Sequence, residues 1–169
     1  MKNIIQLSKT LLPHQHFDAL AVGIVDFKSK TFDVVEVTNF EGELQSTTDP
    51  VMFFDLASVT KPFTNSLTYF LGPQQFSESM LYCLNHRGGL PAWGLLPHQG
   101  WREVINSYTI QESETLYSDY SALRVMLEFD KISSTGMKKT CQRIWDKDMM
   151  NWLDLPSSAP TPQYGMRNG

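Results

Sequence analysis

Two runs of β-branched residues near the amino terminus constrain the fold of this chain more than any other feature. Ala19 to Asp26 and Thr31 to Thr38 are rich in Val, Ile and Thr, and only the segment Phe-Lys-Ser-Lys at 27–30 separates them. This pattern predicts two strands joined by a short turn. A two-stranded ribbon is at best marginally stable by itself. The sequence therefore predicts a sheet that further strands must complete.

Helical patterns dominate the rest of the sequence. A short helix is predicted over residues 3–12, before Pro13, and a polar loop over 39–50, after the hairpin. Beyond residue 57, apolar residues recur at helical spacing, and Pro, Gly or capping residues separate the segments. We expect further helices in five segments: 58–71, 76–84, 101–108, about 119–129, and about 139–153. A hairpin followed by helices indicates an α+β chain.

The length and composition are those of one packed domain. The chain has 169 residues, of which 41% are hydrophobic, and this is enough apolar material for a core of ordinary size. We expect a single domain over 1–169. Its first part, about 1–58, holds the amino-terminal helix and two strands, its second part, about 59–155, is the helical region, and 156–169 form a Pro- and Ser-rich tail.

The charge distribution argues against polyanionic partners. The formal net charge is -4 and no run of Lys or Arg occurs, so neither nucleic acid nor an anionic lipid surface is expected. No stretch approaches the roughly 18 apolar residues of a membrane span, and residues 1–12 are too polar for a signal peptide. As written, the sequence predicts a cytoplasmic protein, and a periplasmic location stays open if a leader was removed. Cys83 and Cys141 lack metal or redox spacing and are expected to be buried free thiols.

Ser58 and Lys61 form a Ser-x-x-Lys element at the start of the predicted helix. Positions three apart on a helix lie on one face, so the hydroxyl and the amine can touch. A serine becomes a nucleophile when a neighbour takes its proton, and a partly desolvated lysine can do so. A chain of this length and composition is expected to hold about one such element by chance. Taken alone, the element is better explained as a capping serine followed by an exposed lysine.

The surroundings of Ser58 resemble a known family. The segment 54–62, Phe-Asp-Leu-Ala-Ser-Val-Thr-Lys-Pro, is similar to the nucleophile segment of class C β-lactamases, their esterase relatives and related DD-peptidases. Residues 86–91, His-Arg-Gly-Gly-Leu-Pro, resemble the His-x-x-Gly-Leu-Pro turn that follows it in that family. Residues 117–119, Tyr-Ser-Asp, resemble its Tyr-x-Asn element. The three motifs occur in the family's order, over most of the chain.

The resemblance implies a fold and a set of site residues. The fold is the α+β one of the serine β-lactamase and penicillin-binding-protein superfamily: an antiparallel sheet flanked by helices, with an inserted helical region. The nucleophile is Ser58, its base is Lys61, and Tyr117 shuttles the proton to the leaving group. Without this family context, the motif at 117–119 would be only a helix cap, and the expectation for His86 is a turn residue without a chemical role.

Asp119 departs from the family pattern, in which Asn is commoner. An Asn side chain both donates and accepts hydrogen bonds, whereas an ionised Asp only accepts. The resemblance implies substrate binding at position 119, and the carboxylate puts that contact in doubt. A carboxylate beside Lys61 also tends to keep the amine protonated, which weakens it as a base.

The family's third element, Lys-Thr-Gly or His-Thr-Gly on a strand, does not occur in this sequence. Residues 138–140, Lys-Lys-Thr, open a predicted amphipathic helix and are not a substitute. We therefore expect an incomplete fold, the amino-terminal portion of a longer hydrolase with doubtful activity by itself. An exposed sheet edge would then allow pairing with a complementing carboxyl-terminal fragment or with another copy.

Three functions remain open from the sequence. The first is acyl transfer from a β-lactam, a D-Ala-D-Ala-type peptide or a small ester through a Ser58 acyl-enzyme, with no metal or organic cofactor. The second is a catalytically impaired relative that binds a cell-wall peptide or a partner protein without turnover. The third is an unrelated α+β interaction domain in which every motif is structural.

Overall fold

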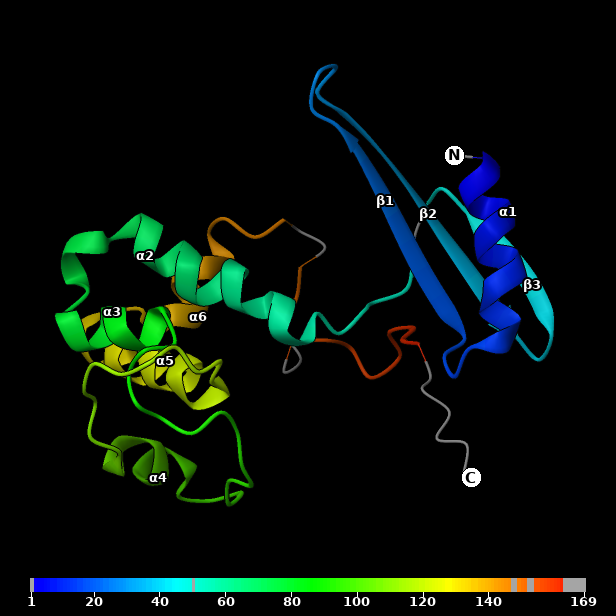
Figure 1. Cartoon of the computed structure of the whole chain (residues 1–169). Coiled ribbons are helices and arrows are strands. Elements are labelled where there is room, and N and C mark those ends of the chain that lie inside the picture. The colour runs from blue at the N-terminus through cyan, green and yellow to red at the C-terminus, as the bar shows by residue number, and fades with distance from the viewer. Residues whose placement is uncertain (1, 50, 147–148, 152–153, 163–169) are drawn as a thin grey trace. The chain divides into compact units, whose positions relative to one another are not determined.

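The computed structural model describes residues 2–49, 51–146, 149–151 and 154–162. The fold is α+β: in the described residues, six α-helices accompany a three-stranded antiparallel sheet (Figure 1). The chain divides into two compact units. The first comprises Met1–Asp55 and Asn151–Gly169, and the second comprises Leu56–Met150.

The predicted hairpin forms the larger part of the sheet in the first unit. Strand β1 is Ala19–Asp26 and strand β2 is Thr31–Phe40, and they pair antiparallel from Ala19 opposite Thr38 to Asp26 opposite Thr31. The turn between them is the predicted segment 27–30. The hairpin prediction is therefore confirmed, because β-branched residues on both sides of a short turn favour this local pairing.

A third strand corrects the loop predicted at 39–50. Strand β3, Glu43–Thr47, pairs antiparallel with the end of β2, in the sheet order β1-β2-β3. Glu41 and Gly42 form a two-residue turn with φ of 53° and 88°. Turns of this kind suit the twist of hairpins but normally carry Asn-Gly or Asp-Gly. Because Glu stands at the first position, the local turn signal is weak and the strand is easily missed from the sequence.

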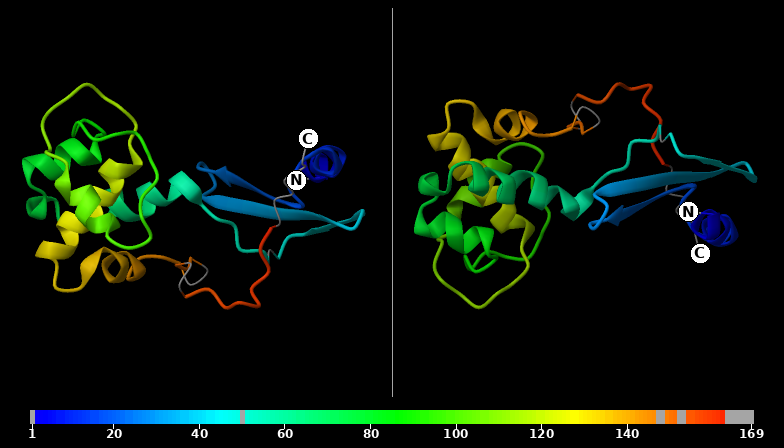
Figure 2. Two further views of the ribbon diagram at one scale, coloured as in Figure 1. Left: turned by 90° about the horizontal axis from the view of Figure 1, so that it is seen from below. Right: turned by 90° about the horizontal axis from the view of Figure 1, so that it is seen from above.

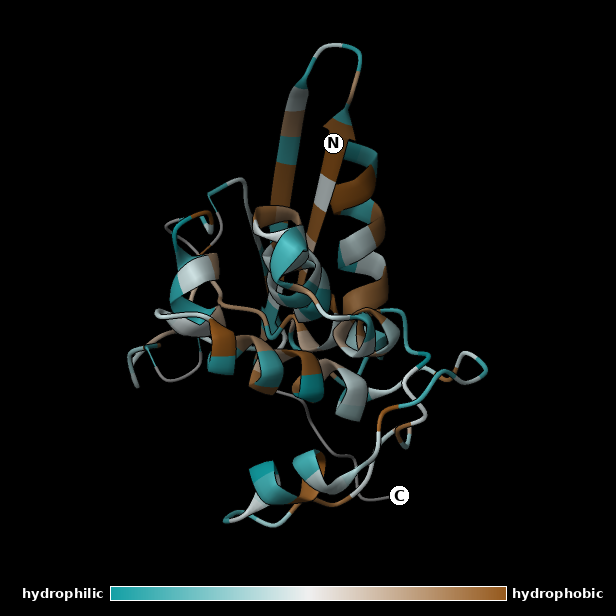
Figure 3. Cartoon of the chain, turned by 90° about the vertical axis from the view of Figure 1, so that its left-hand side faces the viewer, coloured by the Kyte–Doolittle hydropathy of each residue, from teal (hydrophilic) through white to brown (hydrophobic). Residues whose placement is uncertain are grey.

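Helix α1, Lys2–Leu11, covers one face of this sheet, and Figure 2 shows it on one side of the sheet seen nearly edge-on. Leu12, Val35 and Val37 are buried at the contact. The alternation of outward and inward residues places Val35 and Val37 on the same face of β2. In Figure 3 one strand of the hairpin is largely apolar and the other carries both apolar and polar residues. The predicted amino-terminal helix is thus confirmed, and its apolar side supplies the core of the first unit.

Glu36 points to the opposite face of the sheet and is 2% exposed. Its Oε2 accepts hydrogen bonds from the backbone N–H groups of Val51, at 3.2 Å, and Met52, at 2.9 Å. Next to these two bonds, the N–H of Phe53 donates to the carbonyl of Pro160 at 2.8 Å. A carboxylate is costly to bury unless backbone donors satisfy it, so Glu36 fixes the segment after β3 against the sheet.

The helical segments of the second unit follow the predicted order. The nucleophile segment is helical from Ala57 to Leu71, as a 3-10 turn, a wide turn at Pro62–Ser66 and helix α2, Leu67–Leu71. Helix α5, Asp119–Ile132, packs against the surrounding helical segments. These are the segment Pro62–Ser66 and the helices α3, Glu78–Leu84, α4, Trp101–Ser107, and α6, Gly136–Gln142.

The helix predicted at about 139–153 is wrong in its extent. Helix α6 ends at Gln142, and the N–H groups of Ile144 and Trp145 both turn back to the carbonyl of Cys141. The Trp145 indole N–H donates to the carbonyl of Phe63 at 2.9 Å. This tertiary bond forms where the chain leaves helical geometry after α6. The periodic spacing of apolar residues gives no sign of it. Residues 147–148 and 152–153 of that prediction lie outside the described part of the chain.

Other sequence expectations are met in the same unit. Cys83 and Cys141 are both buried and free. Lys138, Lys139 and Thr140 lie in helix α6 and not on a strand. Among the described helices, none has the length and hydrophobicity that crossing a membrane requires.

Replacing Glu36 tests its part in holding the first unit together. Glu36→Ala leaves two partly buried backbone N–H groups without their acceptor, and we expect a loss of about 2 kcal/mol in the free energy of unfolding. Glu36→Gln keeps a side-chain oxygen and should lose less. Urea unfolding followed by circular dichroism measures both, with Glu43→Ala at the exposed start of β3 as a control within about 0.5 kcal/mol of wild type. An equally mild Glu36→Ala would contradict this role.

Candidate active site

Four residues singled out from the sequence lie together in the second unit. Ser58 and Lys61 lie on the first turns of the helical segment that leads into α2. Tyr117 immediately precedes the N-cap of α5, and Asp119 is the first residue of that helix. The four side chains therefore come from two segments more than fifty residues apart in the sequence.

The Lys61 amine is the centre of this cluster. Its Nζ lies 3.1 Å from Oγ of Ser58, 2.8 Å from the phenol oxygen of Tyr117 and 2.7 Å from Oδ1 of Asp119. Each distance is that of a hydrogen bond with the ammonium as donor. The three donors of a lysine are thus directed at three partners. The bond between Lys61 and Asp119 is also an ion pair, with 20% and 53% of the two side chains exposed.

The backbone before Ser58 is strained. Ala57 has a φ of 44°, in the left-handed region that residues with a Cβ rarely adopt, at a cost of about 1–2 kcal/mol. Pro62, four residues after Ser58, has no N–H, so the regular helical bond to the carbonyl of Ser58 cannot form. The helix then widens over Pro62–Ser66. Strain and wide turns of this kind are concentrated at functional sites.

A buried amide ties the two segments together. Asn65 is 7% exposed, and its Nδ2 donates to the carbonyl of Ala122, in the first turns of α5, at 3.2 Å. Asn65 lies one turn after Lys61, and Ala122 lies one turn after Asp119. The bond therefore sets the spacing between the two halves of the cluster. The sequence analysis missed Asn65, because a single Asn within an apolar helix carries no motif.

Ser118 fixes the segment between Tyr117 and Asp119. It is fully buried, its hydroxyl donates to the carbonyl of Pro91 at 2.6 Å and accepts from the N–H of Ser121 at 2.9 Å. The second bond caps helix α5. The N–H of Asp119 also donates to the carbonyl of Ala92 at 2.7 Å. The Leu-Pro-Ala turn thus supports the start of α5 directly.

The pKa values of Lys61 and Tyr117 are shifted in opposite directions. Partial burial alone would lower the pKa of Lys61, but the hydrogen bonds and negative charge of Asp119 and Tyr117 outweigh it and raise the pKa. The pKa of the Tyr117 phenol is lowered, first by its hydrogen bond with Lys61 and then by one with Ser58. The arrangement therefore favours a charged ammonium beside a more acidic phenol.

A cavity of about 320 Å³ adjoins the cluster. Its lining includes Ser58, Lys61 and Tyr117, together with Asn65, Ser66, Cys83 and His86. Burial raises the pKa of the Cys83 thiol to about 11, so it is protonated at neutral pH and does not compete as a nucleophile. His86, expected to have no role, lines this cavity as well.

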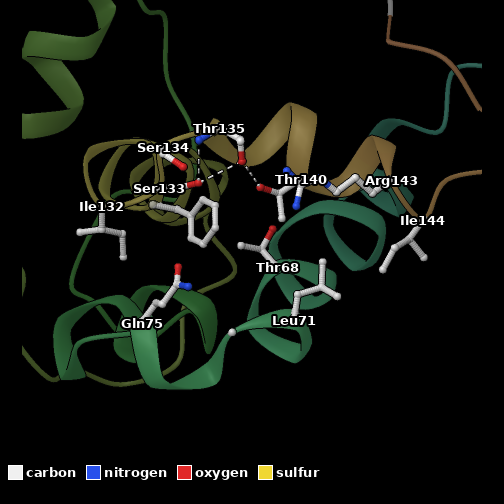
Figure 4. A pocket seen from close by; sticks show the side chains of 12 residues that line it. Thr68, Leu71, Gln75, Ile132, Ser133, Ser134, Thr135, Thr140, Arg143 and Ile144 are labelled. Carbon is white, nitrogen blue, oxygen red and sulfur yellow. Dashed lines mark hydrogen bonds between the residues drawn. The ribbon is translucent and has the colours of Figure 1, made fainter.

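A second cavity, of about 410 Å³, lies between the ends of α2 and α5 and the start of α6 (Figure 4). The hydroxyl of Ser133 receives the N–H groups of Thr135 and Gly136, and the hydroxyls of Thr135 and Thr140 are 3.0 Å apart. These polar groups satisfy one another and the backbone at the turn into α6. This lining is explained by the fold alone. Among the described residues, no three His, Cys, Asp or Glu side chains gather as metal ligands.

Comparison of the chain with protein-family models, with the curated proteins and with the solved structures gave no match. Family membership, inferred from the three sequence motifs, therefore stays a prediction.

Replacing Asn65 tests the connection between the two halves of the cluster. Asn65→Ala removes the hydrogen bond from the buried Asn65 side chain to the carbonyl of Ala122, so we expect a loss of about 1 kcal/mol in the free energy of unfolding. Urea unfolding measures it, with Asn106→Ala on the exposed side of α4 as the matched control. If the two variants were equally stable, the Asn65 bond would not join these segments in solution.

Proposed function

We propose that this chain is a serine acyl hydrolase of the β-lactamase and DD-peptidase superfamily. It acts through a Ser58 acyl-enzyme on a β-lactam, a D-Ala-D-Ala-type peptide or a small ester. One observation carries the proposal: the Lys61 amine lies within hydrogen-bonding distance of the Ser58 hydroxyl and the Tyr117 phenol at once. Acyl transfer through serine requires a neighbour that activates the hydroxyl, and the phenol and the amine in contact with Ser58 are candidates for that role.

The proton transfers follow from the hydrogen bonds. Ser58 accepts a bond from the ammonium of Lys61 and also bonds the phenol of Tyr117, which lowers the pKa of the phenol. In the reaction, Oγ of Ser58 forms a bond to the substrate carbonyl carbon while its proton passes to the Tyr117 phenolate. The phenol then returns this proton to the leaving amine or alcohol as the acyl bond breaks. Water releases the acyl group by the same route in reverse.

Lys61 then acts as a cation in preference to a base. Its pKa is raised by the partners that surround it, chiefly Asp119, so an uncharged amine is disfavoured at neutral pH. A fixed ammonium stabilises the Tyr117 phenolate and keeps the serine hydroxyl oriented toward it. Lys61 as the base remains the alternative expected from the family, and the direction of its pKa favours Tyr117 in that role.

Covalent labelling tests the proposed nucleophile. A fluorescent penicillin or a fluorophosphonate is expected to form an adduct with the chain, and Ser58→Ala is expected to lower labelling by at least about 10³-fold. Intact-mass spectrometry detects the adduct and peptide mapping assigns it. Ser66→Ala, which changes another serine of the same cavity, should keep the adduct. Equal labelling of Ser58→Ala and wild type would refute the proposal.

Replacing Asp119 by Asn tests the charge balance. Asp119 raises the pKa of Lys61 and also of Tyr117, so its neutralisation should lower both. We expect the rising limb of the pH–rate profile for acylation to move to lower pH in Asp119→Asn, with a faster rate at pH 7. A p-nitrophenyl ester reports this rate.

Glu112→Gln, in the exposed ion pair with Arg87, is the control for this experiment and should keep the wild-type profile. An unchanged or alkaline-shifted limb in Asp119→Asn would show that the carboxylate does not govern the titration.

The second candidate is a relative that binds a cell-wall peptide or a partner protein without turnover. The ion pair of 2.7 Å between Lys61 and Asp119 favours it, because a lysine held charged is a poor base. In the labelling experiment, reversible binding of penicillin without a covalent adduct would support this candidate.

Strand β1 offers a site for the partner expected from the sequence. In the described residues it pairs only with β2, and Ile24, Val25, Phe27 and Phe32 of the hairpin are exposed. A strand with one edge unpaired and with exposed apolar residues beside it favours addition of another strand. We propose that a complementing fragment or a second copy of the chain supplies it.

A further inference from the structure

His86 makes contacts that a turn residue without a role would not need. Its carbonyl accepts a hydrogen bond from the N–H of Leu116 at 2.9 Å, and its Nδ1 accepts one from the N–H of Ser118 at 3.1 Å. Leu116 and Ser118 are the two neighbours of Tyr117. The imidazole also lies against the Tyr117 ring, with 4.7 Å between ring centroids and 39° between the planes. His86 therefore bonds the backbone on both sides of Tyr117 and also contacts its ring.

The backbone at His86 is unusual for this residue type. Helix α3 ends in a Schellman motif, in which the N–H of His86 bonds the carbonyl of Cys83 and the N–H of Arg87 bonds that of Tyr82. His86 occupies the left-handed position of this motif, with a φ of 57°, where Gly is the usual residue. Gly88, two residues after His86, is close-packed, because an added Cβ would lie 2.8 Å from the sulfur of Cys83. The turn that begins at His86 therefore packs closely against Cys83 of α3, and the His86 imidazole contacts the Tyr117 ring.

The bond to Ser118 requires a particular protonation state. Nδ1 accepts a backbone N–H only when it carries no proton. The groups that face the imidazole are Lys61, Tyr117, Asp119 and the thiol of Cys83. Burial, and next the charge of Lys61, lower the pKa of His86. The neutral ring is thus favoured at pH 7, with its proton on Nε2.

We propose that His86 is a positioning residue, which holds the Tyr117 phenol against Ser58 and Lys61 through its neutral Nδ1. This inference rests on the proposed function. Protonation of His86 replaces the acceptor by a donor that faces the N–H of Ser118, and the segment carrying Tyr117 is released. Tyr117 then loses its alignment with Lys61, and acylation of Ser58 slows. The site therefore loses activity in acid through His86, in addition to the loss that protonation of the Tyr117 phenolate causes.

The same protonation affects stability, with a definite sign. The pKa of His86 is lower in the folded chain than its ordinary value of 6.5, so the neutral ring stabilises the fold. That contribution is fully present above the unfolded pKa, about 6.5. It is lost as the pH falls through the lower pKa of the folded chain.

Two variants separate the imidazole from the backbone strain. His86→Gly suits the left-handed position and should fold, but it removes Nδ1 and the ring. His86→Asn tolerates a positive φ and carries Oδ1 at the same distance from the backbone as Nδ1, so it keeps the acceptor without titrating near neutral pH. We expect His86→Gly to lower the acylation rate at pH 7.5 by about 10²-fold. We expect His86→Asn to stay within about threefold of wild type and to lose the acidic inflection due to His86.

A readout independent of activity completes the test. In the full chain labelled with nitrogen-15, the Ser118 amide resonance should shift with the protonation of His86 between about pH 5 and 8, and it should stay fixed in His86→Asn. The pKa of Tyr117, from the difference in phenolate absorbance between the chain and Tyr117→Phe, should rise in His86→Gly. Two results would overturn the inference: a wild-type acylation rate in His86→Gly, or a Ser118 amide resonance that does not shift when His86 is protonated.

Failure of the proposed function gives a different result. If the wild-type chain forms no adduct at all, acyl transfer is refuted. The Ser118 and Tyr117 titrations then still decide for or against His86 as the residue that positions Tyr117.

Discussion

The hydrogen bonds of one ammonium group organise the candidate site. The Lys61 amine contacts Ser58 one helical turn before it and Tyr117 and Asp119 from a distant segment. The contact with Ser58 follows from helix geometry, since positions three apart share a face. The contacts with Tyr117 and Asp119 depend on tertiary structure and require the start of α5 to be held in register with the earlier helix. Asn65, Ser118 and His86 provide that support through buried or half-buried hydrogen bonds to the backbone.

The charge at position 119 decides which group can accept a proton. A carboxylate 2.7 Å from the amine stabilises the ammonium, and the ammonium in turn stabilises a phenolate at Tyr117. The lysine and the tyrosine therefore cannot both serve as neutral-pH bases, because each shifts the other in the opposite direction. With Asn at this position the amine would lose its strongest partner. The Asp in this sequence thus moves the basic role toward the phenol, or, if turnover fails, leaves a site that binds only.

Local sequence patterns predicted the parts of the fold that depend on local interactions. The hairpin, the break after Leu71 and a capping residue at the start of α5 all follow from residue types within a few positions. Strand β3 was missed because its turn is Glu-Gly, and α6 was drawn too long because the chain leaves the helix where Trp145 bonds the carbonyl of Phe63. Neither the Glu-Gly turn before β3 nor the early end of α6 changes the periodic pattern of apolar residues in the sequence.

The same limit applies to the site. Ser58, Lys61, Tyr117 and Asp119 could be named from spaced motifs, whereas Asn65 and His86 could not, because their importance lies in which backbone groups they meet. Asn65 bonds a carbonyl 57 residues away, and His86 an amide 32 residues away. A sequence shows residue types and their spacing along the chain, but such a bond depends on which distant segment folds against the residue.

The backbone strain at Ala57 and His86 connects stability with function. Both residues have a positive φ without being Gly, and both lie next to the cluster, one before the serine and one against the tyrosine ring. Substitution by Gly would relieve each strain, so neither residue is optimal for folding. At His86 the alternative would remove the only side chain that can accept the Ser118 amide from this turn, and at Ala57 a freer backbone would hold the serine less firmly. Strain that survives where a better-folding residue is available indicates that orientation of Ser58 and Tyr117 outweighs local stability.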